Sequence, residues 1–156
     1  MIMYRVAGED VGKFMARLLR EDVFDSFEVR GLEITSFTHV EISGEIPGQE
    51  NPETGKPSYW GWERIRPLAV HLVRGKTRPR HLRLVLALPS HELEGIHQNA
   101  GALMLNIHYE SATDEVRIGS GVSPKKFTLE KGLEAEWDKY LEGFVLAHKI
   151  PVTEKI

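Results

Sequence analysis

Apolar residues recur at helical spacing in three segments of the chain. The first segment predicts a helix over about residues 10–21, and the second favours one over about residues 65–73. A strand is the alternative for the second segment, because Leu68, Val70 and Leu72 also alternate. The third segment has an apolar side and an acidic opposite side, so it predicts a strongly amphipathic C-terminal helix. Its apolar stripe consists of Leu133, Trp137, Tyr140, Leu141, Phe144 and Val145. Because this stripe must be buried, we expect the helix to pack on a sheet.

Other segments alternate between apolar and polar residues, which is typical of β-strands with one buried side. This alternation is found in the segments 33–46, 82–88, 102–109, 116–118 and 127–129. The first of them is long enough for one strand or a bent pair of strands. A polar turn at residues 111–114 predicts a hairpin, in which His108 lies opposite Arg117 and Asn106 lies opposite Gly119.

Together these elements predict an α+β fold with a single domain over residues 1–156. We expect an antiparallel sheet of about five strands, with two longer helices and the C-terminal amphipathic helix packed on it. Residues 47–59 contain three prolines and two glycines and predict the longest loop of the chain. Residues 150–156 are expected to form a flexible tail.

Composition narrows the functional classes. The chain has 156 residues, 41% of them hydrophobic and 28% charged, which is an ordinary globular balance. It has no cysteine, so a disulfide scaffold, a thiolate nucleophile and a cysteine zinc site are excluded. The net charge of -3 argues against a protein that coats nucleic acid. No apolar run reaches the roughly 20 residues that a membrane helix needs, and we expect a cytoplasmic protein with no membrane partner.

A basic run over residues 74–83 is the first candidate binding region. It follows a segment of aromatic and basic residues, and rings beside cations suit an anionic ligand or single-stranded nucleic acid. The candidate ligand-binding residues of this region are Trp60, Trp62, Arg66, Arg74 and Lys76. The alternative, which is the more common case for charge runs, is a solvated turn with a tryptophan that anchors the preceding loop.

The polar side of the predicted hairpin is the second candidate region. Asn106, His108 and Arg117 share it, and they could line a pocket for an anion, with His108 as an acid or base. The alternative, which we favour on sequence alone, is a sheet side that faces solvent.

Two further patterns carry less weight. Gly119-Ser120-Gly121 lacks the spacing of a Walker-type phosphate loop and is expected to be a bulge or the end of a strand. The histidines lack the spacing of a helical metal motif, although His39 and Glu41 share one strand side. The sequence therefore predicts no metal site and no cofactor.

Several stretches resemble a known family of bacterial proteins, found mainly in anaerobic Gram-positive species and classed as a domain of unknown function. The matching stretches are Phe14-Met15, Leu18-Leu19, Phe24 to Phe27, Trp62, Arg66-Pro67, Arg74 to Lys76, Pro79, Leu105 to Ile107, Tyr109, Gly119 to Ser123, Phe127 to Lys131 and Trp137-Asp138. The chain departs from the family pattern at Gly119 to Ser123, where Thr-Gly-Thr-Ser is usual, and at Glu130, where Asp is usual. The resemblance implies one intact domain and adds no activity. Trp62, Arg66, Lys76 and Asn106 match recurring positions of the family.

Three functional hypotheses follow from the sequence. The favoured one is a non-enzymatic binding or regulatory domain whose partner is an anionic ligand, a nucleic acid or a protein. The second is a small enzyme or ligand pocket that uses His108 and Arg117. The third is a structural protein that forms oligomers, for example a homodimer, through its exposed aromatic residues.

Overall fold

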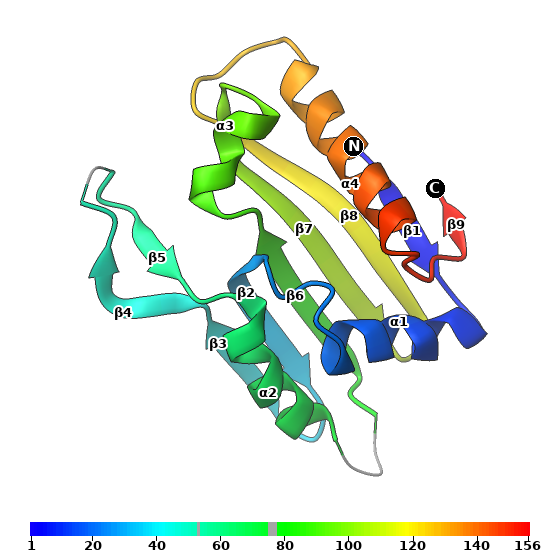
Figure 1. Cartoon of the computed structure of the whole chain (residues 1–156). Coiled ribbons are helices and arrows are strands. Elements are labelled where there is room, and N and C mark those ends of the chain that lie inside the picture. Colours follow the sequence, from blue (N-terminus) through cyan, green and yellow to red (C-terminus); the bar gives the residue numbers. More distant parts are fainter. Residues whose placement is uncertain (53, 75–77) are drawn as a thin grey trace.

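The computed structural model describes residues 1–52, 54–74 and 78–156. Within these residues the chain forms a seven-stranded antiparallel sheet, in the order β3-β2-β6-β7-β8-β1-β9, and a separate two-stranded sheet (Figure 1). The strands of the larger sheet are β1 (Met3–Val6), β2 (Glu28–Thr35), β3 (His39–Ser43), β6 (His81–Ala87), β7 (Ala100–Glu110), β8 (Glu115–Pro124) and β9 (Glu154–Lys155). The smaller sheet consists of β4 (Glu45–Glu50) and β5 (Pro57–Tyr59).

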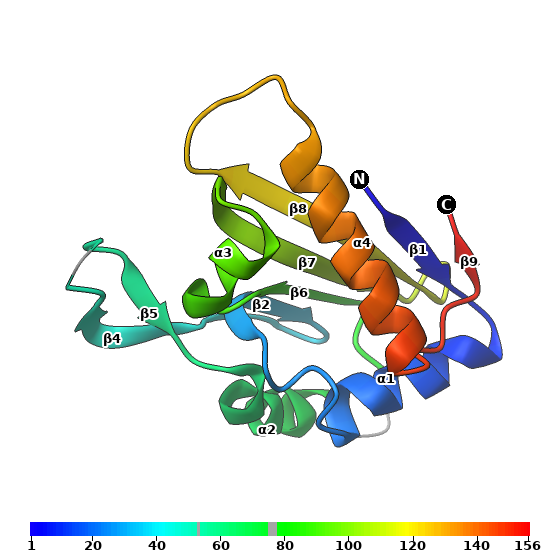
Figure 2. The ribbon, with the colours of Figure 1, turned by 45° about the horizontal axis from the view of Figure 1, so that its top comes forward.

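Four α-helices occur in the described residues, and they pack on one side of the larger sheet (Figure 2). They are α1 (Glu9–Arg20), α2 (Trp62–Val73), α3 (Leu93–Ile96) and α4 (Gly132–Ala147). Buried residues from all of these helices and from the strands beneath them form one hydrophobic cluster. The α+β class and the helices inferred from apolar spacing are therefore confirmed.

The C-terminal helix α4 covers β8, as its apolar stripe predicted. Trp137 is completely buried, and its indole nitrogen donates a hydrogen bond of 2.9 Å to the backbone oxygen of Met104 in β7. Leu133 and Leu141 are also buried, whereas Tyr140 remains 37% exposed. The helix thus covers the interior with one stripe. A buried indole needs both apolar surroundings and a partner for its N–H, and Trp137 has both.

Strict alternation gives the larger sheet two different sides. In β6, Leu82, Leu84 and Leu86 are buried under the helices, while His81 and Arg83, which alternate with them, are exposed. The same alternation continues in β7 and β8, so their polar residues share the side opposite the helices. We call this side the open face. No helix of the described residues packs on it.

The hairpin inferred from the turn at residues 111–114 is confirmed, including its register. His108 pairs with Arg117 and Asn106 pairs with Gly119 across β7 and β8. The segment 33–46 contains a pair of strands, with Ile34 opposite Val40 on the buried side. A register fixed by a short turn is a local property, which explains why it could be read from the sequence.

Several expectations about the architecture were wrong. The larger sheet has seven strands rather than about five, because β1 and β9 extend it beside β8. The segment 47–59 contains most of β4 and all of β5, so it is not a continuous loop. No strand forms at residues 127–129 of the described chain, where Phe127 and Leu129 are each 87% exposed.

The ends of the chain lie side by side at one edge of the sheet. Residues 150–156, where the sequence predicts a flexible tail, contain β9, which pairs with β1. The Thr153 hydroxyl adds contacts to the oxygen of Ala7 and to the carboxylate of Asp10. The pairing of β1 with β9 joins residues about 150 positions apart and leaves no trace in local spacing.

Candidate functional site

One row of charged residues crosses the open face. Strand register places Glu33 beside Arg83, Arg83 beside His108, and His108 beside Arg117. Arg5 of β1 follows next to Arg117. Directly opposed residues on neighbouring strands have Cβ atoms about 5 Å apart, so these side chains can act on a common ligand.

The two arginines that flank His108 lack close carboxylate partners. The Arg83 side chain makes no hydrogen bond or ion pair with any residue that the structure describes. Arg117 is 57% exposed, and its nearest carboxylate is Glu115 at 3.9 Å. Arg5 differs from both, because it contacts Glu115 at 3.0 Å and Glu154 at 2.6 Å. The unneutralised positive charge of the row is therefore concentrated on either side of His108.

His108 itself is partly buried in this row. Burial lowers the pKa of its imidazole below the usual range, and the positive charge of Arg83 lowers it further. The nearby Glu110 carboxylate acts in the opposite direction. At neutral pH the ring is therefore uncharged, with one N–H that can donate and one nitrogen that can accept a hydrogen bond or bind a metal.

Two glycines of β8 lie beside Asn106 on the open face. Gly119 lies opposite Asn106, and the end of the Met3 side chain lies 3.8 Å from where a Gly119 Cβ atom would stand. A Cβ atom added to Gly121 would lie 3.3 Å from the Asn106 side-chain nitrogen. Glycine at this position thus gives the Asn106 amide room to lie along β8. Asn106 is exposed and its amide makes no hydrogen bond within the described part of the chain.

A shallow hollow adjoins the row on its β2 and β3 side. It has a volume of about 220 Å³ and opens to solvent. Gly31 and Val85 line it, together with Arg83 and with the carboxylates of Glu33 and Glu41, which follow Arg83 across β2 and β3. A bound molecule could therefore place an anionic group at Arg83 and a hydrogen-bond donor in the hollow.

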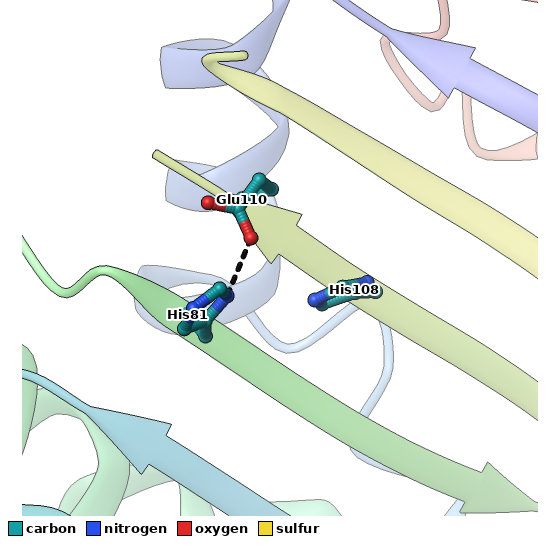
Figure 3. A group of neighbouring side chains, drawn as sticks. All are labelled: His81, His108 and Glu110. Carbon is teal, nitrogen blue, oxygen red and sulfur yellow. Dashed lines mark ion pairs between the residues drawn. The ribbon is translucent and has the colours of Figure 1, made fainter. Parts of the chain in front are cut away.

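Next to the row, His81, His108 and Glu110 form a compact cluster (Figure 3). The Nδ1 atom of His81 lies 2.5 Å from a carboxylate oxygen of Glu110. The rings of His81 and His108 are stacked with centroids 6.1 Å apart. A second cluster, formed by Glu33, His39 and Glu41, lies on β2 and β3. Both groups have the residue types that hold metal ions.

The first candidate region from the sequence is largely occupied by structural contacts. Trp62 is completely buried, and its indole nitrogen donates a hydrogen bond of 2.9 Å to the backbone oxygen of Leu18 in α1. It lies on the helix-covered side of the sheet. Trp62 and the hairpin residues therefore do not meet in one pocket, since the sheet separates them.

The remaining residues of that region are dispersed. Arg66 forms a two-pronged ion pair with Asp25, at 3.0 and 2.8 Å. Trp60 is 36% exposed and has the guanidinium of Arg64 5.2 Å from its ring centre. Arg74 is exposed at the end of α2, and Lys76 lies outside the described residues.

Ser120 of the glycine-rich segment is a structural residue. It lies on the buried side of β8, where its hydroxyl donates a hydrogen bond of 2.6 Å to Asp138 of α4. The same oxygen accepts a hydrogen bond of 3.1 Å from the backbone of Ile2. The sequence predicts a bulge or a strand end at Ser120. In the structure Ser120 lies in the middle of β8, and its two glycine neighbours face the open side.

His81, Arg83 and Glu110 are not among the site residues expected from the sequence. Arg83 was noted only as a member of the basic run. The alternation of residues 82–88 was a usable signal, because it places His81 and Arg83 on the polar side of a strand. What the sequence lacked was the pairing of β6 with β7, which sets Arg83 beside His108.

The fold and this face define a class: an α+β protein whose helices cover one side of an antiparallel sheet and whose other side carries ionisable residues. Residues 17–153 match the model of a family described as a family of unknown function, DUF5721, and the chain belongs to that family. No curated protein and no solved structure matches the chain. Among the described residues, no helix combines the length and apolar character needed to cross a membrane.

Proposed function

We propose that this protein is a binding domain for a small anionic molecule, which lies on the open face between Arg83 and Arg117. The observation that carries this proposal is that both guanidiniums flank His108, where Arg83 has no carboxylate partner in the described residues and Arg117 has only Glu115, at 3.9 Å. An arginine fork matches the oxygens of a phosphate or carboxylate group. His108 and Asn106 supply further hydrogen-bonding groups beside it.

A small ligand fits this surface better than a nucleic-acid chain. The unneutralised arginines lie on β6 and β8, two strand spacings apart, which is about 10 Å. Carboxylates border them, with Glu33 on one side, Glu110 on another, and Arg5 already paired to Glu115. A nucleic-acid backbone needs cations along an extended path, and the repeated carboxylates would repel it.

The hollow beside Arg83 extends the proposed site. Its volume of about 220 Å³ can receive part of a metabolite-sized molecule whose anionic group contacts the arginines. Glu33 and Glu41, which also line the hollow, favour a ligand with hydroxyl or amino donors. We therefore propose an organic phosphate or carboxylate that also carries such donors.

Binding of pyrophosphate, used as a simple probe, tests the proposal. Titration at low salt, in buffer with a metal chelator, should shift backbone amide signals of β6, β7 and β8 in an NMR spectrum. The double variant Arg83→Ala/Arg117→Ala should weaken binding at least about tenfold, which corresponds to about 1.4 kcal/mol. Added salt should weaken binding of the unmodified protein.

The matched control removes the same charge elsewhere. Arg64→Ala/Arg74→Ala takes two exposed arginines from α2 and its end and should leave pyrophosphate affinity unchanged. Equal losses in both double variants would mean that net charge alone attracts the probe. That result, or unchanged binding in Arg83→Ala/Arg117→Ala, would refute a site on the open face.

We further propose that the chain is a single cytoplasmic domain of bacterial origin. The single cluster of buried residues in the described chain supports one domain. The absence of cysteine is in keeping with a reducing compartment. The sequence stretches that resemble bacterial proteins support the origin. Limited proteolysis tests the first point, since a single domain should be cut first in the projecting β4–β5 hairpin and leave no stable half.

A further inference from the structure

Three potential metal ligands converge on the open face, at the end of the charged row. One ring nitrogen each of His81 and His108, and a carboxylate oxygen of Glu110, all lie within 4.8 Å of one another. Ligand atoms around a tetrahedral ion with bonds of about 2.1 Å are about 3.4 Å apart. Small side-chain rotations would therefore bring the three atoms to bonding distance.

The backbone holds these residues in place. His81 and Glu110 are directly paired across β6 and β7, and His108 is two residues before Glu110 on the same side of β7. Both strands lie in the middle of the seven-stranded sheet, so each is hydrogen-bonded on two sides. Figure 3 shows the His81 ring and the Glu110 carboxylate directed toward one another, with His108 beside them. Ligands on rigid central strands need little reorganisation when they bind an ion.

The ligand types indicate the class of metal. Two imidazoles with one carboxylate suit zinc and neighbouring first-row transition metals, whereas calcium and magnesium prefer oxygen ligands alone. The cluster supplies three protein ligands and stands on an exposed surface, with His81 48% exposed. Three ligands leave at least one coordination position for an external molecule.

The second cluster, of Glu33, His39 and Glu41, is less suited to an ion. Both ring nitrogens of His39 already have partners, since Nδ1 lies 2.7 Å from the Thr35 hydroxyl and Nε2 lies 3.1 Å from Glu41. Its strand β3 is an edge strand. In contrast, neither ring nitrogen of His108 has a hydrogen-bond partner among the described residues.

We propose that His81, His108 and Glu110 bind one divalent transition-metal ion of the zinc class. An oxygen of the anion held by Arg83 and Arg117 completes the coordination, and this second part rests on the proposed function. The metal adds positive charge next to the arginines, so the two ligands should bind with positive cooperativity.

Cobalt titration of metal-free, tag-free protein tests the site, because Co²⁺ reports tetrahedral nitrogen and oxygen coordination by its visible absorption. One equivalent per chain should bind, and Zn²⁺ should displace it while excess Mg²⁺ should not. His108→Ala and Glu110→Gln should each weaken Co²⁺ binding more than about tenfold, since loss of a direct ligand exceeds the effect of a supporting residue. Thermal unfolding without metal should be unchanged in Glu110→Gln, which shows that the variant is folded.

Two control variants separate this site from general histidine binding. His39→Ala removes the second cluster, and His71→Ala removes an exposed histidine of α2. Both should bind Co²⁺ like the unmodified protein. Unchanged binding in His108→Ala and Glu110→Gln, or loss of binding in His39→Ala, would overturn the proposal.

The arginine variant distinguishes a failed metal site from a failed anion site. Arg83→Ala/Arg117→Ala should retain Co²⁺ binding but lose the spectral change that pyrophosphate causes in the unmodified protein. Co²⁺ binding without any effect of pyrophosphate would leave the metal site and refute the joint coordination. Pyrophosphate binding under chelator, with no Co²⁺ binding at all, would leave the anion site and refute the metal.

Discussion

Helix α2 and the open face both carry more than one arginine, but these arginines have different surroundings. Arg66 of α2 is fixed by Asp25, with side chains 23% and 16% exposed. On the strands of the open face, Arg83 has no side-chain partner in the described residues, and Arg117 has only a long contact of 3.9 Å with Glu115. A charged side chain that is already paired contributes to folding, whereas an unpaired one on a rigid support retains the capacity to bind a ligand.

The tryptophans make the same distinction. Trp62 donates its N–H to Leu18 and has no exposed surface, so it joins α1 and α2 from within. Trp60, two residues earlier, remains 36% exposed. Residue type alone therefore does not show whether a tryptophan binds a ligand. Its burial shows that Trp62 belongs to the core. The following predictions test whether the two regions divide in this way between folding and binding.

The largest effect should come from Trp62→Ala. Loss of a fully buried indole should lower the free energy of unfolding by about 3–5 kcal/mol, because it leaves a cavity and an unpaired carbonyl. Urea denaturation measures this value. Trp60→Ala is the control and should cost less than about 1 kcal/mol. Near-equal costs for the two tryptophans would contradict the division.

The two sides of β6 should respond very differently to neighbouring substitutions. Leu84→Ala should cost about 2–5 kcal/mol, since Leu84 is completely buried under the helices. Arg83→Ala should change stability by no more than about 0.5 kcal/mol, because its exposed side chain has no partner in the described residues. A destabilisation by Arg83→Ala as large as that by Leu84→Ala would show that Arg83 is needed for folding.

A double-mutant cycle on Arg66 and Asp25 measures how firmly the α2 arginine is engaged. Their two-pronged, half-buried pair should show a coupling energy of about 1–3 kcal/mol by urea denaturation. The exposed pair of Arg78 with Asp114, at 3.2 Å, serves as the comparison and should couple by less than about 1 kcal/mol. Pyrophosphate binding should be unaffected by Arg66→Ala, and a loss there would move the site toward α2.

The smallest expected effect on stability comes from the buried carboxylate of Glu28. One oxygen of Glu28, at the start of β2, is buried without a hydrogen-bond partner among the described residues. Burial raises the pKa of Glu28 above the ordinary value of 4.5. The folded state therefore holds the Glu28 proton more tightly than the unfolded state does. The contribution of this proton to the free energy of unfolding is complete below pH 4.5 and is lost as the pH rises through the raised pKa.

Glu28→Gln removes this charge and should raise the urea midpoint at pH 7. The difference from the unmodified protein should shrink as the pH falls toward 4.5 and vanish below it. Glu63→Gln, on the exposed surface of α2, is the control and should show no such pH dependence. A midpoint that falls at pH 7 in Glu28→Gln would mean that the carboxylate has an ionic partner in solution.

Sequence reasoning was accurate where structure depends on near neighbours. The turn at residues 111–114 was enough to place His108 opposite Arg117, and the register confirms it. The apolar stripe with Trp137 was enough to predict a helix that covers the sheet. It failed for β9 and for the strand count, because those depend on contacts between distant parts of the chain.

For the candidate site, the sequence by itself determined which residues alternate toward solvent on each strand, and therefore which could share the open face. Only the tertiary structure decided that β6 lies beside β7, which sets His81 and Arg83 next to Glu110 and His108. It also decided that Trp62 and Arg66 are already engaged by Leu18 and Asp25. The physical reason is that side-chain period is a property of each strand, whereas strand order and partner choice depend on how the whole interior packs.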